Sequence, residues 1–531
     1  MEAAGLGRRE LIGAVFGQLS GWRLIGLRPA SCHRSTIGES PVTVDALGGG
    51  AWPAPGRRSL GLATVVVLGW KNNTVGQGHA WAWHPVHRWS VGCRGTAGRA
   101  GLAMGLEARK EPSTIMPLKR QAIRVSDIRY RFKTPAFEFM FQWVLGMQTN
   151  RGSEVGESFY AASLVTENDP RSWVAAWTQV ARQVEQRAAA ALAAGHAVSA
   201  REAYLRAYVY NRAALMCIDP FDAAARPAWQ HAVECFRRSA ALADPVVEPV
   251  SVPCGGVDLP GYFVAPGDGQ AKRKTLLMIG GGDTYVEDLY LIIGPAAVKR
   301  GYNLLIVDLP GQGGLPFDGL YMRPDTENQI PQVVDYALSR PEVDGAQLAA
   351  YGISYGGYIL PRALSVERRI RATAVCSALS DFHAWMTPTP ASVRFVTHPD
   401  SLLVKTIVRT RYLKPSLILL DTYAWRWGAK SYADMLDVAK DFTLDPARIA
   451  CPLLSIVGEK EYTHSAVSRK FQDDAIKANR NPQSRLIVVK ASDGGDAHAI
   501  GTNLSLMAQL VFDWLDEVLA AKPSMSASAQ G

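Results

Sequence analysis

The strongest constraint on the fold is a regular alternation of short apolar runs and amphipathic stretches that begins near residue 246. Six runs bounded by Gly, Pro or Asp fit buried parallel strands: 275–280, 303–310, 347–354, 371–379, 452–458 and 485–491. Helix-length segments such as TENQIPQVVDYALSR separate them, and two earlier runs, VEPVSVP and LPGYFVAP, fit an antiparallel pair. The pattern predicts an α/β sheet whose strands are joined by helices.

The segment before this sheet has the 3.6-residue period of helices. Four residues recur at spacings of 4, 3 and 4 on one helix face: Trp173, Trp177, Val180 and Val184. Gly195 is placed to end that helix, and Ser199 with Glu202 three residues later predicts a capping box at the start of the next. Without a sustained 34-residue repeat, a helical cap domain over 116–245 is favoured over a tetratricopeptide-like array. The catalytic domain is then expected at 246–522.

Residues 1–115 differ in composition from the rest of the chain. They are rich in Gly, Arg and Trp without a helix or strand period, and we expect a poorly ordered or non-native extension there. Their 13 Lys and Arg against 6 Asp and Glu supply most of the net charge of +9. The remaining chain is therefore close to neutral, which argues against binding of nucleic acid. An Ala- and Ser-rich disordered tail is expected at 523–531.

The cysteine pattern and hydropathy indicate a cytoplasmic protein. Seven cysteines, an odd number with no C-x-x-C pair, argue against a disulfide framework or a structural zinc site. No run of 18 or more apolar residues is present, so no membrane span is expected.

Ser354 is the candidate nucleophile. The stretch LAAYGISYGGYILP places it at the end of a buried strand and the start of a helix, between Gly352 and Gly356. In a G-x-S-x-G turn the two glycines are required because side chains there collide, and the strained turn raises the serine hydroxyl above the sheet. In a loop without chemistry, the same residues would only reverse the chain.

A serine nucleophile needs an imidazole base and an acid that orients it, in the chain order Ser, acid, His. His498 lies in the loop after the last strand and is the expected base. The remaining histidines after Ser354 fit ordinary surface or lid positions: His383, His398 and His464. Glu459 and Glu461 both follow the strand PLLSIVG, and Glu461 is favoured because it occupies the third position after the strand's glycine.

Two backbone amides are expected to stabilise the negative charge that develops on the substrate oxygen. Tyr355 supplies one because it follows the nucleophile, and Gly282 in the loop GGGD after strand 275–280 supplies the other. Residues 381–445 interrupt the strand–helix alternation and fit a lid insertion. Its aromatic residues Trp385, Tyr423 and Trp425 are candidate substrate contacts.

These motifs together resemble the FrsA-like α/β-hydrolases, a family that includes 2,6-dihydroxypseudooxynicotine hydrolase and fungal hydrolases that shorten polyketide pigments. The matching stretches cover roughly residues 125–520: SAREAYLRAYVYNRAAL, VDLPGYFVAP, GGGDTYVEDLY, VDLPGQG, YGISYGGYILPRAL and CPLLSIVGEKE. The resemblance implies the α/β-hydrolase fold, a mostly parallel eight-stranded sheet under an N-terminal helical cap, acting as a homodimer without metal or organic cofactor. Glu461 stands where aspartate is usual, and Gly282 where a larger apolar residue is common.

The expected activity is therefore that of a serine hydrolase with a Ser354–His498–Glu461 triad. The resemblance implies cleavage of a ketone-adjacent C–C bond or an ester in an aromatic or polyketide-like small molecule. A carboxylesterase, thioesterase or peptidase of the same fold is the alternative within enzymes. A non-catalytic scaffold built on the helical cap is the alternative outside them.

Overall fold

The computed structural model describes Ser126 and residues 128–267, 271–387, 414–479 and 481–520, together with the backbone of two strands nearer the N-terminus. The chain divides into two compact units, Met1–Glu111 and Pro112–Gly531. In the first unit, β1 (Val65–Gly69) pairs antiparallel with β2 (His84–Trp89), where the sequence had suggested no strand. The predictions for the rest of 1–115 and for the tail 523–531 lie outside the described residues.

The second unit contains an eight-stranded sheet, as predicted. Its strands lie in the order β10-β9-β8-β7-β5-β6-β4-β3. They are β3 (Glu248–Cys254), β4 (Val257–Val264), β5 (Arg273–Ile279), β6 (Asn303–Val307), β7 (Val343–Ile353), β8 (Ala372–Cys376), β9 (Leu453–Gly458) and β10 (Arg485–Val489). The β3–β4 and β4–β6 pairs are antiparallel and the remaining pairs are parallel. Every residue of β6, β8 and β9 is buried, as expected for parallel strands covered on both faces.

Alternate residues of the central strands enter two hydrophobic cores on opposite faces of the sheet. In β5, Leu276 and Met278 join one core, whereas Leu277 and Ile279 join the other. The helices that cover the sheet are α6 (Val286–Lys299), α7 (Ile330–Ser339), α8 (Gly356–Ala363), α14 (Glu459–His464), α15 (Ala466–Ala478) and α16 (Leu504–Ala520). Short 3₁₀ helices are η2 (Met147–Asn150), η3 (Leu315–Asp318), η4 (Thr326–Asn328), η5 (Pro446–Arg448), η6 (Ala491–Asp493) and η7 (His498–Ile500).

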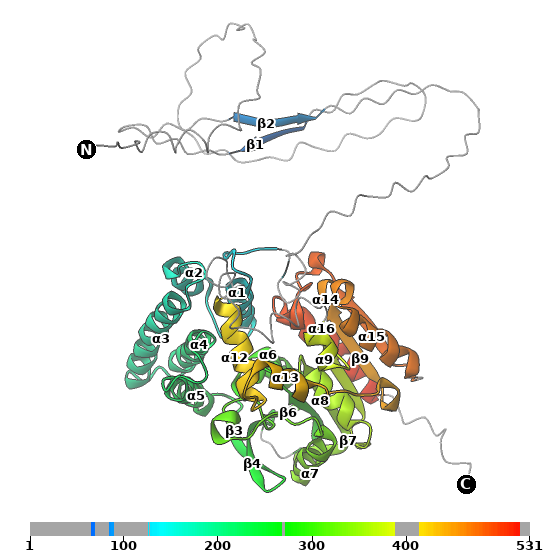
Figure 1. The fold of residues 1–531 in the computed structure, drawn as a ribbon. Coiled ribbons are helices and arrows are strands. Elements are labelled where there is room, and N and C mark those ends of the chain that lie inside the picture. Colours follow the sequence, from blue (N-terminus) through cyan, green and yellow to red (C-terminus); the bar gives the residue numbers. More distant parts are fainter. Residues whose placement is uncertain are drawn as a thin grey trace, which may run out of the picture. The chain divides into compact units, whose positions relative to one another are not determined.

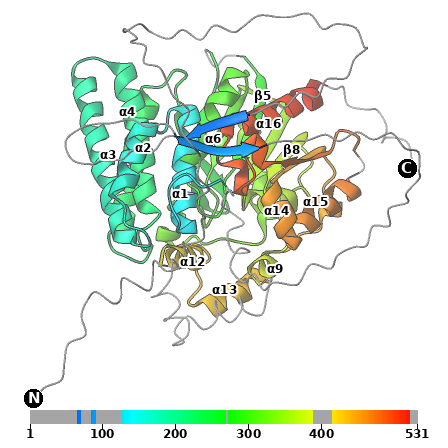
Figure 2. The same cartoon turned by 90° about the horizontal axis from the view of Figure 1, so that it is seen from above.

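Five helices precede the sheet: α1 (Pro135–Gly146), α2 (Val155–Leu164), α3 (Pro170–Ala193), α4 (Ala197–Leu215) and α5 (Ala225–Ala241). Figure 1 shows α2–α5 beside one another on one side of the sheet, and in both Figures 1 and 2 α14 and α15 lie at the side opposite α2–α4. The predicted apolar face of α3 is buried, and it shares one continuous core with the sheet face that carries Leu276. The cap and the sheet therefore belong to one compact unit.

At the boundary between α3 and α4, the structure differs from the start of the helix that the capping-box pattern predicted. Gly195 has φ +80° and ends α3 as predicted. The predicted N-cap at Ser199 is wrong, because α4 already begins at Ala197, two residues earlier. The left-handed glycine reverses the chain so tightly that helical geometry resumes at once, and Ser199 lies inside the first turn.

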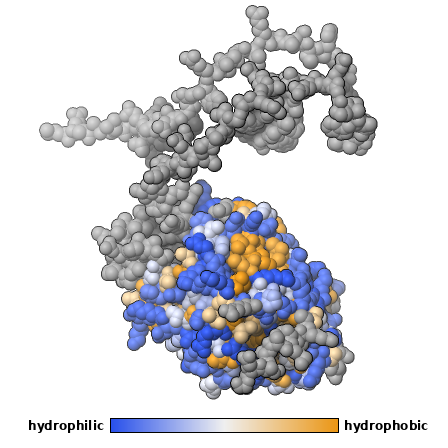
Figure 3. All heavy atoms as spheres, turned by 90° about the vertical axis from the view of Figure 1, so that its right-hand side faces the viewer, coloured by the Kyte–Doolittle hydropathy of each residue, from blue (hydrophilic) through white to orange (hydrophobic). Residues whose placement is uncertain are grey.

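The described part of the 381–445 insertion is helical, with α9 (Phe382–Met386), α12 (Lys414–Arg426) and α13 (Tyr432–Ala439). Helix α12 contacts α1 of the cap. Among the described residues, no helix is both long and apolar enough to cross a membrane. The face in Figure 3 is largely hydrophilic, with a compact group of apolar residues exposed among polar ones.

Candidate active site

Ser354 lies on a strained turn between β7 and α8. Its φ of +56° falls in the left-handed region, which residues with a Cβ rarely adopt. A Cβ at Gly352 would lie 2.3 Å from the Gly356 carbonyl oxygen, and a Cβ at Gly356 would lie 2.3 Å from the Ile279 carbonyl oxygen. Both contacts are with backbone, so neither can relax. The predicted steric need for two glycines is confirmed.

The structure brings the three predicted polar residues into one hydrogen-bonded row. His498 Nε2 is 2.9 Å from Ser354 Oγ, and His498 Nδ1 is 2.7 Å from Glu461 Oε1. His498 and Glu461 are 9% and 4% exposed, so bulk water competes little for these contacts. Glu461, rather than its neighbour Glu459, is the carboxylate that reaches the imidazole.

Ser377 holds the far side of the Glu461 carboxylate. Its hydroxyl donates to Glu461 Oε2 at 2.5 Å and accepts from the Ala499 N–H at 2.9 Å. Ser377, Ala499 and Ile500 all have positive φ, as Ser354 does. Each such residue costs about 1–3 kcal/mol, and strain of this kind concentrates at functional sites. Ser377 was not anticipated from the sequence, because it becomes a partner of Glu461 only when β8 and β9 pair.

The loop after β5 lies against the nucleophile. A Cβ at Gly281 would be 3.4 Å from Ser354 Oγ, and a Cβ at Gly282 would be 3.6 Å from Tyr355 Cβ. Buried Gln312 holds this loop: its Nε2 donates to the carbonyl oxygens of Gly280 and Gly281 at 2.7 and 3.1 Å. Gly282 and Tyr355, the two predicted amide donors, are therefore neighbours beside Ser354.

A pocket of about 200 Å³ opens at Ser354 and His498. Its walls are mostly apolar and come from α1, α4 and α12, with Phe139, Trp143, Leu215 and Trp425 among the lining residues. The three candidate substrate contacts differ in position. Trp425 lines the pocket, the Tyr423 ring lies against Gly282, and Trp385 packs on Phe382 in the second core with ring centroids 6.2 Å apart.

Charged side chains cluster behind the loop after β5. Arg212 donates to the Asp283 carbonyl oxygen at 2.6 Å and pairs with Asp288 at 3.1 Å. Glu287 lies nearby, and burial raises its pKa to about 7. Burial also raises the pKa of Asp308 well above its usual range. The signal for Arg212 was present in the sequence, since it follows Tyr204 and Tyr208 at four-residue spacings on the same face of α4.

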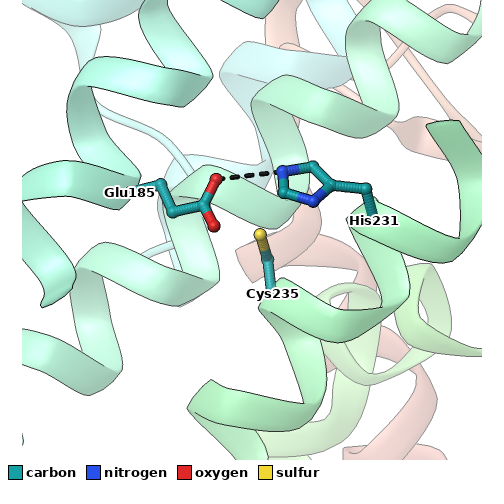
Figure 4. Close-up of side chains that lie close together, drawn as sticks. All are labelled: Glu185, His231 and Cys235. Atoms are coloured by element: carbon teal, nitrogen blue, oxygen red, sulfur yellow. Dashed lines mark hydrogen bonds and ion pairs between the residues drawn. The ribbon is translucent and has the colours of Figure 1, made fainter.

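Within the described part of the chain, one group of three residues has metal-type ligand atoms within 4.8 Å of one another: Glu185, His231 and Cys235 (Figure 4). They lie on α3 and α5, and none lines the pocket. His231 Nε2 already contacts Glu185 Oε2 at 2.9 Å, and burial raises the pKa of the Cys235 thiol to about 12. At neutral pH these residues form a protonated thiol beside a surface His–Glu pair.

Comparisons with known proteins place the chain in a family. The family model described as "Esterase FrsA-like" matches residues 161–394. The α/β-hydrolase xenA of Xenoacremonium sinensis is 30% identical over 422 residues, which cover 73% of this chain and 98% of that protein. The 20-hydroxy-prefusarin hydrolase FUS2 of Gibberella moniliformis is 28% identical, over 74% of this chain and 98% of the relative.

Among solved structures, the crystal structure of 2,6-dihydroxy-pseudo-oxynicotine hydrolase is similar in fold. Its TM-score is 0.56 at 21% identity, and the match covers 71% of this chain and 95% of that one. The expected fold class is confirmed, with its mostly parallel sheet and preceding helices. The chain is an α/β-hydrolase and belongs to the FrsA-like family.

Proposed function

We propose that this protein is a serine hydrolase in which Ser354, His498 and Glu461 form the catalytic triad. The observation that carries the proposal is the pair of hydrogen-bond contacts that His498 makes, with Ser354 Oγ at 2.9 Å and with Glu461 Oε1 at 2.7 Å. Ser354 has a positive φ and lines the pocket. Glu461 orients the imidazole and stabilises the imidazolium, and its own second oxygen is held by Ser377.

The reaction follows from this arrangement. His498 Nε2 accepts the proton of Ser354 Oγ as the oxygen attacks a substrate carbonyl carbon. The Gly282 and Tyr355 amides donate to the resulting oxyanion. When the tetrahedral intermediate collapses, the imidazolium returns the proton to the leaving group, an alcohol for an ester or the carbon of an enolate for a 1,3-diketone. Water, activated by the same imidazole, then releases the acid from Ser354.

The substrate is proposed to be an aromatic or polyketide-like small molecule with a scissile ester or ketone-adjacent C–C bond. The apolar walls of the pocket support this choice. The name of the relative FUS2 states that it is a hydrolase of 20-hydroxy-prefusarin, and a related substrate class for this chain is part of the proposal. Assembly as a homodimer stays a prediction.

The proposal is tested by steady-state hydrolysis of 4-nitrophenyl hexanoate. Ser354→Ala and His498→Ala should each lower kcat by about 10⁴- to 10⁶-fold. Wild-type rates in Ser354→Ala would favour the non-catalytic scaffold. Product masses from 1-phenyl-1,3-butanedione distinguish C–C cleavage, which yields benzoic or acetic acid, from an activity restricted to esters, thioesters or amides.

A further inference from the structure

Three residues from different segments form a polar cluster in the wall of the mostly apolar pocket: Arg212 of α4, Tyr285 before α6, and Arg426 of α12. All three line the pocket that contains Ser354 and His498. The Cζ atoms of Arg212 and Arg426 lie 4.5 and 5.1 Å from the centre of the Tyr285 ring. We call these residues the Arg–Tyr cluster. Each is at most 6% exposed, so the cluster is built into the core of the site.

The two guanidinium groups differ in how their charges are balanced. Arg212 pairs with Asp288, whose other oxygen accepts the Tyr208 hydroxyl. Arg426 donates from Nη1 to the Gly311 carbonyl oxygen at 2.9 Å. Within the described residues its Nε has no acceptor, and it forms no ion pair with a carboxylate. Arg426 is thus a buried cation held in place by a neutral group.

Two acidic side chains, Asp308 and Asp283, act electrostatically on the arginines of the cluster, and Asp283 also lines the pocket. Arg426 interacts with Asp308, but burial raises the pKa of Asp308 well above its usual range, which disfavours the charged carboxylate. The charge of Asp283 acts on Arg212. Because a buried guanidinium that lacks a hydrogen-bonded ion pair is incompletely compensated for its lost hydration, an anion that enters the pocket beside Arg426 would bind favourably.

The chemistry of the guanidinium group indicates the class of ligand. A guanidinium is planar and presents its N–H groups as a fork, which matches planar, delocalised oxyanions. Burial raises the pKa of the Tyr285 phenol, so the phenol stays protonated beside the two guanidinium groups. We propose that the Arg–Tyr cluster binds a delocalised oxyanion of the substrate, either a carboxylate or the enolate of a 1,3-dicarbonyl group, while the apolar walls enclose the rest of the molecule. This inference rests on the proposed function, because the molecule that carries the oxyanion is taken to be the substrate whose carbonyl carbon Ser354 attacks.

Binding to the full-length Ser354→Ala protein tests the inference without turnover. Calorimetric titration compares 4-phenylbutanoate with 4-phenylbutanamide, and 1-phenyl-1,3-butanedione with 4-phenyl-2-butanone. We expect the member of at least one pair that is, or can become, an oxyanion to bind about 10- to 100-fold more tightly, as for hydrogen bonds to charged groups. The first pair reports a carboxylate site and the second an enolate site. Equal affinity within both pairs overturns the proposal.

Variants in the same background identify the residue responsible. Arg426→Met should abolish the preference for the anion and leave affinity for the neutral member within about threefold, whereas Arg426→Lys should retain part of it. Thr422→Val is the matched control, because Thr422 lines the same pocket from α12 and its hydroxyl donates to the Ile418 carbonyl oxygen of the same helix. A preference that persists in Arg426→Met overturns the assignment, and circular dichroism of each variant checks its fold. Failure of the proposed function is seen separately, as absence of ester hydrolysis by the wild type.

Discussion

Gln312 links the stability of the protein to the position of its oxyanion-binding loop. Its side chain is fully buried and makes three hydrogen bonds. Nε2 donates to the Gly280 and Gly281 carbonyl oxygens, and Oε1 accepts from the Leu309 N–H at 2.9 Å. Methionine has nearly the same length and volume but none of these polar atoms. Gln312→Met therefore removes the hydrogen bonds and leaves little cavity.

The expected loss of stability follows from the backbone groups that Gln312→Met leaves without a hydrogen-bond partner. The Gly281 carbonyl oxygen keeps the Thr284 hydroxyl as a donor at 3.2 Å, whereas the Gly280 carbonyl oxygen and the Leu309 N–H lose the Gln312 side chain. Each buried unsatisfied group costs about 1–3 kcal/mol, so we expect a loss of about 3 kcal/mol in the free energy of unfolding. Because one oxyanion donor contributes about 10²- to 10³-fold to kcat, displacement of the Gly282 amide should lower kcat by about 10²-fold.

Urea unfolding measures the first effect, and hydrolysis of 4-nitrophenyl hexanoate measures the second. Gln472→Met is the matched control, since Gln472 is equally buried and bonds Ser455 and the Ala378 carbonyl oxygen, away from this loop. The control should lose stability but keep kcat within about threefold. Gln312→Met with wild-type stability and wild-type kcat would refute the reasoning.

Three further outcomes are expected. Glu461→Gln should lower kcat for the aryl ester by about 10⁴-fold, because the amide disturbs the imidazole tautomer, while Glu459→Gln stays within about twofold. Gly356→Ala should destabilise the fold by more than about 3 kcal/mol in urea unfolding, since its Cβ meets backbone at 2.3 Å. The raised pKa of Glu287, about 7, means that the folded state binds this proton more tightly than the unfolded state. The free energy of unfolding should therefore fall by about 3 kcal/mol as pH rises from 4.5 to 7, and Glu287→Gln should flatten that dependence.

Each of these outcomes has a result that would contradict it. For the triad acid, it is Glu459→Gln losing more activity than Glu461→Gln. For the turn, it is Gly356→Ala unfolding no more readily than Gly156→Ala, where an added Cβ meets nothing within 4 Å. For Glu287, it is an unfolding free energy that has the same pH dependence in the variant and the wild type, measured by urea titration at each pH.

The parts of the site that sequence could predict depend on local chain geometry. Ser354 is recognisable because its turn tolerates only glycine at Gly352 and Gly356, a rule that acts within five residues. Glu461 and His498 follow from their places after the last two strands. The row of contacts between them was predictable because parallel strands end at the same edge of the sheet.

The parts that could not be predicted depend on contacts between distant segments. Gln312 acts on Gly280 from 32 residues away, and Arg426 acts on Gly311 from 115 residues away. Neither residue belongs to a periodic sequence pattern, because a single polar residue that becomes buried does not recur at helix or strand spacing. Trp385 shows the same limit: as an aromatic residue in the insertion it suited a substrate contact, yet α9 packs it against Phe382 in the core.

The central claim is that Ser354 is the activated nucleophile. The most direct measurement is covalent labelling of the full-length protein with a fluorophosphonate probe, followed by mass spectrometry of the tryptic peptides. We predict one stoichiometric adduct on Ser354, strongly reduced labelling in His498→Ala, and none in Ser354→Ala. An adduct on another residue, or an unlabelled Ser354 in the folded wild-type protein, would contradict the account.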